Sequence, residues 1–342
     1  MKRMIVVLAV ALVGGIILFT GCQSTAVSSA KVYIQQNNYD AAIEQAQLAI
    51  EQEPDNAEAH FVLGNAYGMK SMFREMNDAY TKSLGLSDKH AEEIDHSRLK
   101  YWIDLFNTAV GEIKQDQLDE AAENFQLCTE LMPDKIDAYK NLAFVYSQAG
   151  NTEDAIEAYK KGLEVDPTDV EMKNFLGVLY YQSKQYDAAI EVLSQVLEES
   201  DPTTEAYKQA LFNVAFSYDL KGEPEKAIQA YKNALEAVPG DKDLNFNLAR
   251  LYYMQDNFDE AIVWFNQVLG LDPNDFEANF NIGVSNLQMD KFEEAVPYLE
   301  KATEINPANA NAWTNLGIAY VRAGDSEKGQ AAFDRADALK TE

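Results

Sequence analysis

A period of 34 residues is the feature that most constrains how this chain of 342 residues folds. From residue 23 onward the sequence divides into nine units, of which seven are 34 residues long, the fifth carries four extra residues and the last stops one residue short. The units span residues 23–56, 57–90, 102–135, 136–169, 170–207, 208–241, 242–275, 276–309 and 310–342, with an insertion at 91–101. A fixed period of this length is typical of repeat proteins, in which each unit packs on its neighbours.

Four positions within the unit carry the periodic pattern. Position 8 is Ala or Gly in every unit, positions 11 and 20 are Tyr and Ala in seven of nine units, and position 32 is Pro in six. Small residues at positions 8 and 20 allow two helices to approach closely, while large side chains at positions 11 and 24 fill the space beside them. Proline at position 32 ends the second helix. Each unit is therefore expected to form a pair of packed helices.

This pattern resembles the tetratricopeptide repeat, and the stretch AWTNLGIAYVRAGD at residues 312–325 is close to that family's consensus. The family has a large residue at position 4, Leu-Gly at 7 and 8, Tyr at 11, Ala at 20, an aromatic residue at 24, Ala at 27 and Pro at 32. The resemblance covers essentially all of residues 23–342. It implies an all-α fold, a right-handed α-solenoid of about nine helix-turn-helix units that we place at residues 30–342, with the first helices lining a concave groove.

Two units depart from the pattern. Position 21 is apolar in most internal units, but in the second unit it is Asn77, shortly before the insertion at 91–101. We expect an irregular junction there, with the next first helix lengthened backward from Trp102. In the last unit positions 21 and 28 are Gln330 and Asp337, and a terminal repeat needs such a polar outer face. The sequence therefore predicts that the array ends there.

The first 21 residues are typical of an export signal. Lys2 and Arg3 precede an apolar run that ends at Phe19, and small residues follow it. The stretch FTGC, residues 19–22, resembles the lipobox of bacterial lipoproteins, in which Leu is usual where Phe19 stands. That resemblance implies cleavage before Cys22 and lipid attachment to the Cys22 thiol. Residues 22–29 are then a short tether.

The alternative interpretation of this segment is an uncleaved anchor helix, although the apolar run is short for the ~20 residues that span a bilayer. Either interpretation predicts an exported protein held at a bacterial membrane. Gln23 follows Cys22, and in cells with two membranes this resembles lipoproteins of the outer membrane that face the periplasm.

The net charge of −28 bears on the class of partner. An acidic surface repels nucleic acid and anionic lipid and favours basic partners. The chain has two cysteines, Cys22 and Cys128. If Cys22 carries lipid, an internal disulfide is excluded, and Cys128 is expected to be a buried apolar residue.

Asparagine and phenylalanine recur side by side in the first helix of the unit. Position 6 is asparagine in six units: Asn107, Asn141, Asn213, Asn247, Asn281 and Asn315. Position 5 is phenylalanine in five units: Phe61, Phe106, Phe212, Phe246 and Phe280. An amide side chain can pair with both backbone groups of a peptide unit. One asparagine per unit is therefore expected to hold an extended peptide about every third residue, with the phenylalanines beside it.

This row resembles the asparagine ladder in the repeat domain of O-GlcNAc transferases. The alternative is plain repeat packing, because Asn at 6 and an aromatic residue at 5 are also consensus in the family. The fifth unit has Phe175 in place of the asparagine, so the row from 213 to 315 is the better candidate.

Charged residues on the same helices suggest the kind of ligand. Position 2 is acidic in five units, at Glu58, Asp137, Glu171, Asp243 and Glu277. These carboxylates are either a solvated face or a rim that favours a basic ligand. Lys140 and Arg250 are the main basic candidates, and we assign Arg250 to the peptide site. They are three units apart, so the carboxylate clamp that other tetratricopeptide groups use does not match.

No pattern indicates catalysis. The stretch HAEEIDH, residues 90–96, places two histidines six apart, whereas ligands on one helix face are three or four apart. We interpret it as a polar helix extension. The sequence has no glycine-rich phosphate loop, no Ser/His/Asp signature and no CxxC. We therefore expect a protein that is not an enzyme and has no cofactor or metal site.

Together these features predict a membrane-anchored scaffold that binds a protein or an extended peptide in its groove, in the assembly of a cell-envelope complex. Two alternatives stay open. The first is a structural subunit that docks through its convex face or the 91–101 insertion. The second is an accessory to a carbohydrate system, although the chain has only Trp102, Trp264 and Trp313, and repeat position 4 predicts that Trp313 is a core residue.

Overall fold

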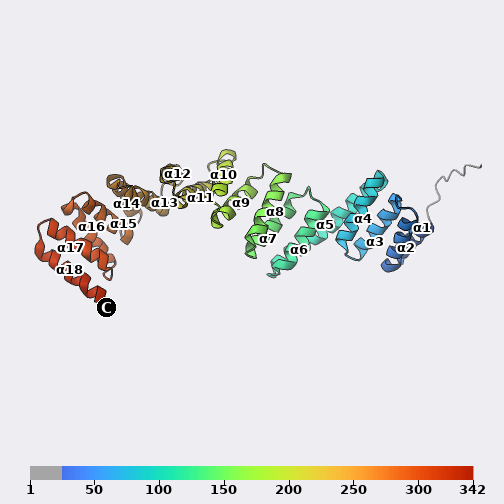
Figure 1. Cartoon of the computed structure of the whole chain (residues 1–342), viewed down its shortest axis with the longest axis horizontal. Coiled ribbons are helices and arrows are strands. Elements are labelled where there is room, and N and C mark those ends of the chain that lie inside the picture. The colour runs from blue at the N-terminus through green and yellow to red at the C-terminus, as the bar shows by residue number, and fades with distance from the viewer. Residues whose placement is uncertain (1–24, 342) are drawn as a thin grey trace, which may run out of the picture. The chain divides into compact units, whose positions relative to one another are not determined.

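The computed structural model describes residues 25–341, so the export signal and Cys22 lie outside the described residues. Residues 25–341 form eighteen α-helices and one 3-10 helix, η1 (Asp88–His90), and no strand (Figure 1). The first helices of the nine units are α1 (Thr25–Gln35), α3 (Ala57–Met69), α5 (Ala91–Ile113), α7 (Ile136–Gln148), α9 (Val170–Gln182), α11 (Glu205–Lys221), α13 (Lys242–Met254), α15 (Phe276–Gln288) and α17 (Ala310–Arg322).

The second helices are α2 (Tyr39–Gln52), α4 (Phe73–Leu86), α6 (Leu118–Leu131), α8 (Thr152–Val165), α10 (Tyr186–Glu199), α12 (Pro224–Ala237), α14 (Phe258–Leu271), α16 (Phe292–Ile305) and α18 (Ser326–Thr341). The predicted all-α fold of helix pairs is confirmed. The chain divides into two compact units, residues 1–138 and 139–342, and the boundary falls inside α7. Within each unit a helix packs on its partner in the pair and on helices of the adjoining repeats.

The small residue at position 8 is a packing requirement, as predicted. In four repeats it is glycine, and the side chain at position 24 of the same repeat lies against it. A Cβ atom on Gly64 would lie 2.5 Å from the Tyr80 ring, and one on Gly177 would lie 2.4 Å from Leu193. Gly283 meets Leu299 in the same way. These contacts set the distance between the two helices of a repeat.

First helices begin at a side-chain cap that recurs at position 34 of the preceding repeat. At five of these positions an Asn or Asp side chain accepts a hydrogen bond of 2.8–3.0 Å from the backbone N–H three residues later: Asn56, Asp169, Asp241, Asp275 and Asn309. Such N-caps satisfy a backbone donor that has no partner inside the helix. The residue at position 34 thus begins the first helix of the next repeat, after the proline at position 32 has ended the second helix of the preceding repeat.

First helices end in a turn whose residue at position 15 has a positive φ in all nine repeats. These residues are Asn37, Ser71, Asp116, Gly150, Lys184, Gly222, Asp256, Asp290 and Gly324, with φ between 56° and 95°. In each repeat the N–H of position 16 donates to the carbonyl of position 11, for example Gln185 to Tyr180 at 2.8 Å. This is the Schellman arrangement that closes a helix C-terminus. It reverses the chain so that the second helix packs on the first.

The junction after the second repeat is irregular, as the sequence predicts. The helix α5 is 23 residues long and includes the whole 91–101 insertion. Asn77 on α4 accepts a hydrogen bond of 2.9 Å from Arg98 Nε and donates one of 3.0 Å to the Glu130 carbonyl on α6. Arg74 also pairs with the Glu130 side chain at 2.9 Å. A polar bridge therefore replaces the apolar contact that position 21 makes elsewhere.

Two element boundaries differ from the prediction. The first helix begins at Thr25 rather than at residue 30, because Ala26 and Val27 are buried in the core with α3 and do not form a tether. The helix α11 begins at Glu205, before the unit boundary at 208, since Thr204 caps it with its side chain. Much of the four-residue insertion in the fifth unit is thereby absorbed into a helix.

The last helix has the polar outer face expected of position 21. Gln330 on α18 is exposed and donates a hydrogen bond of 2.9 Å to Asp334. Among the helices between residues 25 and 341, none is both long and apolar enough to span a bilayer.

Candidate functional site

The asparagines at position 6 lie at the surface of first helices. In the unit of residues 139–342, Asn213 on α11, Asn247 on α13, Asn281 on α15 and Asn315 on α17 are all half-buried. They occupy the same register on helices of successive repeats, so their amides form a row along one face of this unit. We call these four residues, with Leu220, Met254 and Ile318 beside them, the amide face.

Three of the four amides are oriented by their own helices. The Nδ2 group donates to the carbonyl four residues earlier, from Asn247 to Asp243 at 2.8 Å, from Asn281 to Glu277 at 2.7 Å and from Asn315 to Asn311 at 2.9 Å. An amide has two N–H donors and one carbonyl acceptor. Each of these side chains therefore keeps one donor and its Oδ1 acceptor, which are the two groups that a peptide unit requires.

The phenylalanines at position 5 are partly committed to packing. Phe212 and Phe246 are half-buried against the core of this unit, and the Phe246 ring meets Phe265 edge-on with centroids 5.5 Å apart. Phe280 stacks on Phe276 at 5.8 Å. These rings support the asparagine beside them, and only their outer edges are open to a ligand.

Large apolar side chains on the same faces were not singled out from the sequence. Leu220 is 58% exposed, Met254 66% and Ile318 40%. They occupy positions 13, 13 and 9, one or two turns from the asparagine at position 6. Single exposed apolar residues are ordinary, but Leu220 and Met254 occupy the same position in adjacent repeats. The signal was present in the sequence as apolar residues at repeat positions 9 and 13.

Arg250 forms a fixed ion pair. Its guanidinium binds the Asp219 carboxylate on α11, and the same carboxylate accepts a hydrogen bond of 3.1 Å from the Tyr231 hydroxyl. Burial, together with the Asp219 charge, raises the pKa of Tyr231 well above its usual range, so the phenol stays a donor. Arg250 therefore joins α13 to α11 with its charge neutralised.

Lys140 is likewise paired. It lies 2.7 Å from Asp169 and 3.0 Å from Glu171. Burial alone lowers the pKa of this lysine, but hydrogen bonds to the two carboxylates outweigh it and raise the pKa. Asp243 and Glu277, in contrast, are exposed on α13 and α15 next to the amide face. The charge beside that face is therefore negative.

The predicted peptide-site residues of the first compact unit lie in a different setting. Asn107 is exposed on α5, while Phe106 is half-buried between Trp102 and Phe125, with ring centroids 4.7 Å and 5.2 Å away. Asn141, at the start of the second compact unit, is half-buried on α7. Phe61 stacks flat on the buried ring of His90 at 4.1 Å. His90 is therefore part of the packing and does not belong to a polar helix surface, as HAEEIDH had suggested.

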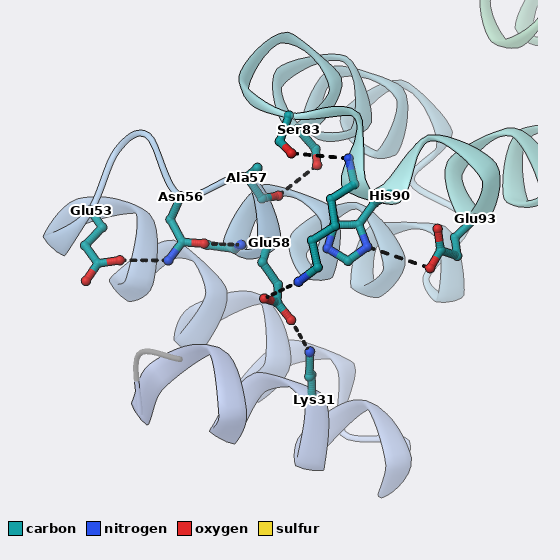
Figure 2. Close-up of polar contacts among 11 residues, drawn as sticks. Lys31, Glu53, Asn56, Ala57, Glu58, Ser83, His90 and Glu93 are labelled. Carbon is teal, nitrogen blue, oxygen red and sulfur yellow. Dashed lines mark hydrogen bonds and ion pairs between the residues drawn. The ribbon is translucent and has the colours of Figure 1, made fainter. Parts of the chain in front are cut away.

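Glu58, one of the acidic residues at position 2, holds three helices together. Its carboxylate on α3 pairs with Lys31 on α1 and, at 3.2 Å, with Lys89 on η1 (Figure 2). Burial opposes ionisation, but the hydrogen bonds and charges of the two lysines outweigh it and lower the pKa of Glu58 to about 2. This glutamate has a structural role.

The three tryptophans are divided between the two compact units, with Trp102 in the first and the other two in the second. Trp102, Trp264 and Trp313 lie on α5, α14 and α17, and each packs partly against a core. Trp313, expected in the core, is only half-buried, and its indole N–H donates to the Pro307 carbonyl at 3.0 Å. Within residues 25–340, no group of three or more His, Cys, Asp or Glu side chains is placed to hold a metal ion.

Comparison with known proteins identifies the repeats. The family model described as "Tetratricopeptide repeat" matches residues 112–177, 147–211, 220–279 and 286–341, and a related one, "TPR repeat", matches residues 30–71.

Curated relatives share part of their length with this chain. "Protein O-mannosyl-transferase TMTC3" of Homo sapiens is 25% identical over 209 residues, which are 59% of this chain and 22% of that protein. "BBSome complex member BBS4" of Bos taurus is 29% identical over 130 residues, 38% of this chain and 24% of that protein. "Probable UDP-N-acetylglucosamine--peptide N-acetylglucosaminyltransferase SPINDLY" of Hordeum vulgare is 27% identical over 172 residues, 48% of this chain and 17% of that protein. The chain thus spans less than a quarter of the length of each.

Among solved structures, the C-terminal part of a TPR repeat-containing protein from Cytophaga hutchinsonii has a TM-score of 0.57 at 20% identity, over 69% of this chain and 95% of that one. The structure of YrrB, described as a TPR protein with an unusual peptide-binding site, has a TM-score of 0.48 at 24% identity, over 56% of this chain and 96% of that one. The model described as "Tetratricopeptide repeat" alone matches more than half of the chain. The chain belongs to the tetratricopeptide repeat family.

Proposed function

We propose that the amide face holds an extended segment of a partner protein. Repeats of this family form scaffolds that bind proteins and peptides, and this chain is a scaffold of that kind. The observation that carries the proposal is the row of Asn247, Asn281 and Asn315, each fixed by its own helix with one donor and one acceptor left over. Fixed donors and acceptors bind a backbone with little loss of side-chain entropy.

The spacing of the helices suits an extended peptide. Packed helices lie about 8–10 Å apart, and an extended chain advances about 3.3 Å per residue, so one amide per repeat meets about every third peptide unit. Leu220, Met254 and Ile318 offer apolar contact between the amides. Asp243 and Glu277 favour basic residues in the ligand. The bound segment is therefore an extended peptide that combines aliphatic and basic side chains.

The wider setting is part of the same proposal. An export signal at residues 1–21 and lipid on Cys22 would hold the scaffold at a bacterial envelope, facing the periplasm where the cell has two membranes. The function is then assembly of an envelope complex by binding, without catalysis by this chain. The basic start and apolar run of residues 1–21 and the lipobox-like FTGC support this setting.

The test is selection from a displayed library of random peptides on the purified full chain in mild detergent. Selected peptides are then titrated against the parent and against a variant with Asn213, Asn247, Asn281 and Asn315 changed to Ala. We expect the variant to bind at least about tenfold more weakly, because each lost amide pair contributes roughly 0.5–1.5 kcal/mol.

A matched control is available on a second helix. Asn266 on α14 is exposed and makes the same hydrogen bond, of 2.9 Å, to the carbonyl four residues earlier. Changing Asn266 to Ala together with Asn233, which is exposed on the second helix α12, should leave binding unchanged. Equal binding by the parent and the fourfold variant, with both chains equally helical, would show that the asparagines are repeat architecture only.

A further inference from the structure

The extension of α5 lines one side of a cavity. About 660 Å³ of space lies between the first turns of α5 and the end of α6, entirely within the first compact unit. Its lining comes from residues 92–99 on one side and residues 131–134 on the other. A cavity of this size is in the range that binds a compact ligand or a few side chains of a peptide.

The floor of this cavity is apolar. Leu99, Leu131, Met132 and Pro133 contribute to it, and Leu99 is 38% exposed although it is a leucine on a helix in contact with two others. One turn further along α5, Ile103 is 44% exposed. Residues four apart lie on the same helix face, so Leu99 and Ile103 form a short aliphatic stripe that leads out of the cavity.

The rim of the cavity is negative. Glu92 and Asp95 on α5 and Asp134 after α6 are exposed, and within the described residues none of the three takes part in an ion pair. Asp95 and Leu99 are also four apart, so one face of α5 changes from acidic to aliphatic along its length.

The two basic groups in the lining form their hydrogen bonds with groups other than the carboxylates of this rim. Arg98 donates hydrogen bonds of 2.9 Å to Asn77 and to Thr81 and is thereby held against α4. His96 Nδ1 lies 2.8 Å from the Glu92 carbonyl oxygen, inside its own helix turn. Burial lowers the pKa of Arg98, and the nearby charge of Asp95 acts in the opposite direction.

We propose that this cavity is a second docking site, for a basic amphipathic segment of a partner protein. A large aliphatic side chain of the partner fills the floor at Leu99 and Leu131, and Lys or Arg on the adjacent turn meets Glu92, Asp95 and Asp134. The carboxylates repel phosphate groups, so lipid headgroups and nucleic acid do not fit the same site. The site lies outside the amide face and does not depend on it.

The test uses a designed probe on the full chain in mild detergent. The probe is a fluorescent helical peptide with Leu and Ile four residues apart and two Lys on the preceding turn. Its twin has Glu in place of both lysines. We expect the lysine peptide to bind, with an affinity that falls as salt rises, and the glutamate twin not to bind. Backbone hydrogen exchange should slow at residues 92–99 and 131–134.

Reversing charges on the rim tests whether the peptide binds at this cavity. Asp95→Lys with Asp134→Lys should weaken the lysine peptide at least about tenfold and create binding of the glutamate twin. The matched control is Glu44→Lys with Glu123→Lys, which changes the net charge equally at exposed sites on α2 and α6 and should change binding less than about twofold. The fourfold asparagine variant of the amide face should bind the probe like the parent.

Two results would overturn the proposal. Equal loss of binding in the two double-lysine variants would mean that the peptide responds only to overall charge. If the lysine peptide does not bind at about 1 mM, the cavity does not hold such a segment, because the binding free energy is then weaker than roughly 4 kcal/mol.

Discussion

At the scale of single residues, position 4 of the repeat shows how polar groups enter a packed surface. Asn279 on α15 is buried and donates hydrogen bonds to the Asp275 carbonyl at 2.8 Å and the Pro273 carbonyl at 3.3 Å. His60 Nε2 and Trp313 Nε1 reach the carbonyls of Pro54 and Pro307, both at 3.0 Å. These prolines lie just beyond the end of a second helix, and a side chain at position 4 of the next repeat provides a hydrogen-bond partner for the proline carbonyl.

The two cysteines should behave oppositely. Cys128 is fully buried, its thiol donates a weak hydrogen bond of 3.6 Å to the Trp102 carbonyl, and burial raises the pKa of this thiol to about 12. We expect Cys22→Ser to abolish incorporation of labelled fatty acid and to release the protein from the membrane fraction. Cys128→Ser should retain both, and the Cys128 thiol should react with a thiol reagent only in denaturant. Label retained in Cys22→Ser would rule out lipid on that residue.

Glu58 should make the first compact unit sensitive to acid. Its pKa lies at about 2 in the folded protein and near 4.5 in an exposed glutamate, so its contribution is complete above about pH 5 and is lost as pH falls toward 2. Solvent reaches both lysine partners, which limits the contribution to about 2 kcal/mol. Glu58→Gln should lower the stability of this unit at pH 7, measured by hydrogen exchange in α1 and α3. The difference from the parent should shrink as pH falls; a constant difference would contradict the ion-pair explanation.

At the scale of elements, the helices follow from the periodic pattern, but the turns do not. The residues at position 15 share a positive φ and include Asn37, Ser71, Lys184 and three glycines, so no residue type predicts the conformation. The Schellman hydrogen bonds impose it, and those depend on the helix that precedes the turn. The sequence identified Asn77 as a break in the pattern because it is polar at a repeat position that is apolar in most internal units. Its partner Glu130 could not be found, because it is 53 residues away in sequence.

The turn at Lys184 is a place where the sequence is not optimal for its conformation. Lys184 is exposed and has φ of 62°, a region that costs a residue with a Cβ about 1–2 kcal/mol and glycine very little. We expect Lys184→Gly to raise the free energy of unfolding of the second compact unit by about 0.5–1 kcal/mol in chemical denaturation. Gly222→Ala is the matched variant in which the opposite effect, a loss of stability, is expected. No atom lies within 4 Å of the added Cβ, so that loss would come from backbone strain at φ of 79°. Unchanged stability in both variants would mean that the turns relax at no cost.

The candidate site could be predicted only in part. The register of Asn213, Asn247, Asn281 and Asn315 follows directly from the period, and the structure places them on one row of first helices. The ion pair between Arg250 and Asp219 was not predicted. The periodic pattern does not indicate that Asp219, at position 12 of the preceding repeat, is the partner of Arg250. The cavity beside α5 was also not predicted. The length of the 91–101 insertion was evident from the sequence, but the sequence did not show which face of α5 lies beside the end of α6.

At the scale of the whole molecule, each compact unit is a series of helices whose main contacts are with their own repeat and the adjoining ones. Stability in such an array is approximately a sum of repeat and neighbour terms. The clusters of buried residues follow the chain in order, from Ala26–Ala79 to Ala295–Ala332. Damage in one repeat should therefore spread to its neighbours and weaken with distance along the chain.

A core truncation near the C-terminal repeats tests this locality. Leu299 on α16 is fully buried against Gly283, and Leu299→Ala should cost about 2–5 kcal/mol. We expect faster amide exchange in α15 to α18 and unchanged exchange in α1 to α4. Met76→Ala, which empties a fully buried site on α4, should give the reverse pattern. Uniform acceleration along the whole chain in either variant would indicate one cooperative core.

The contact of each helix with near neighbours alone also has a mechanical consequence. If Cys22 is held by lipid and a bound partner is pulled away from the amide face, force passes through the repeats in series. A repeat can then detach as a hairpin without first breaking contacts elsewhere, and it releases 34 residues, or about 12 nm of extended chain. Under tension the protein should lengthen in equal steps, as an extensible link between membrane and partner and not as a rigid strut.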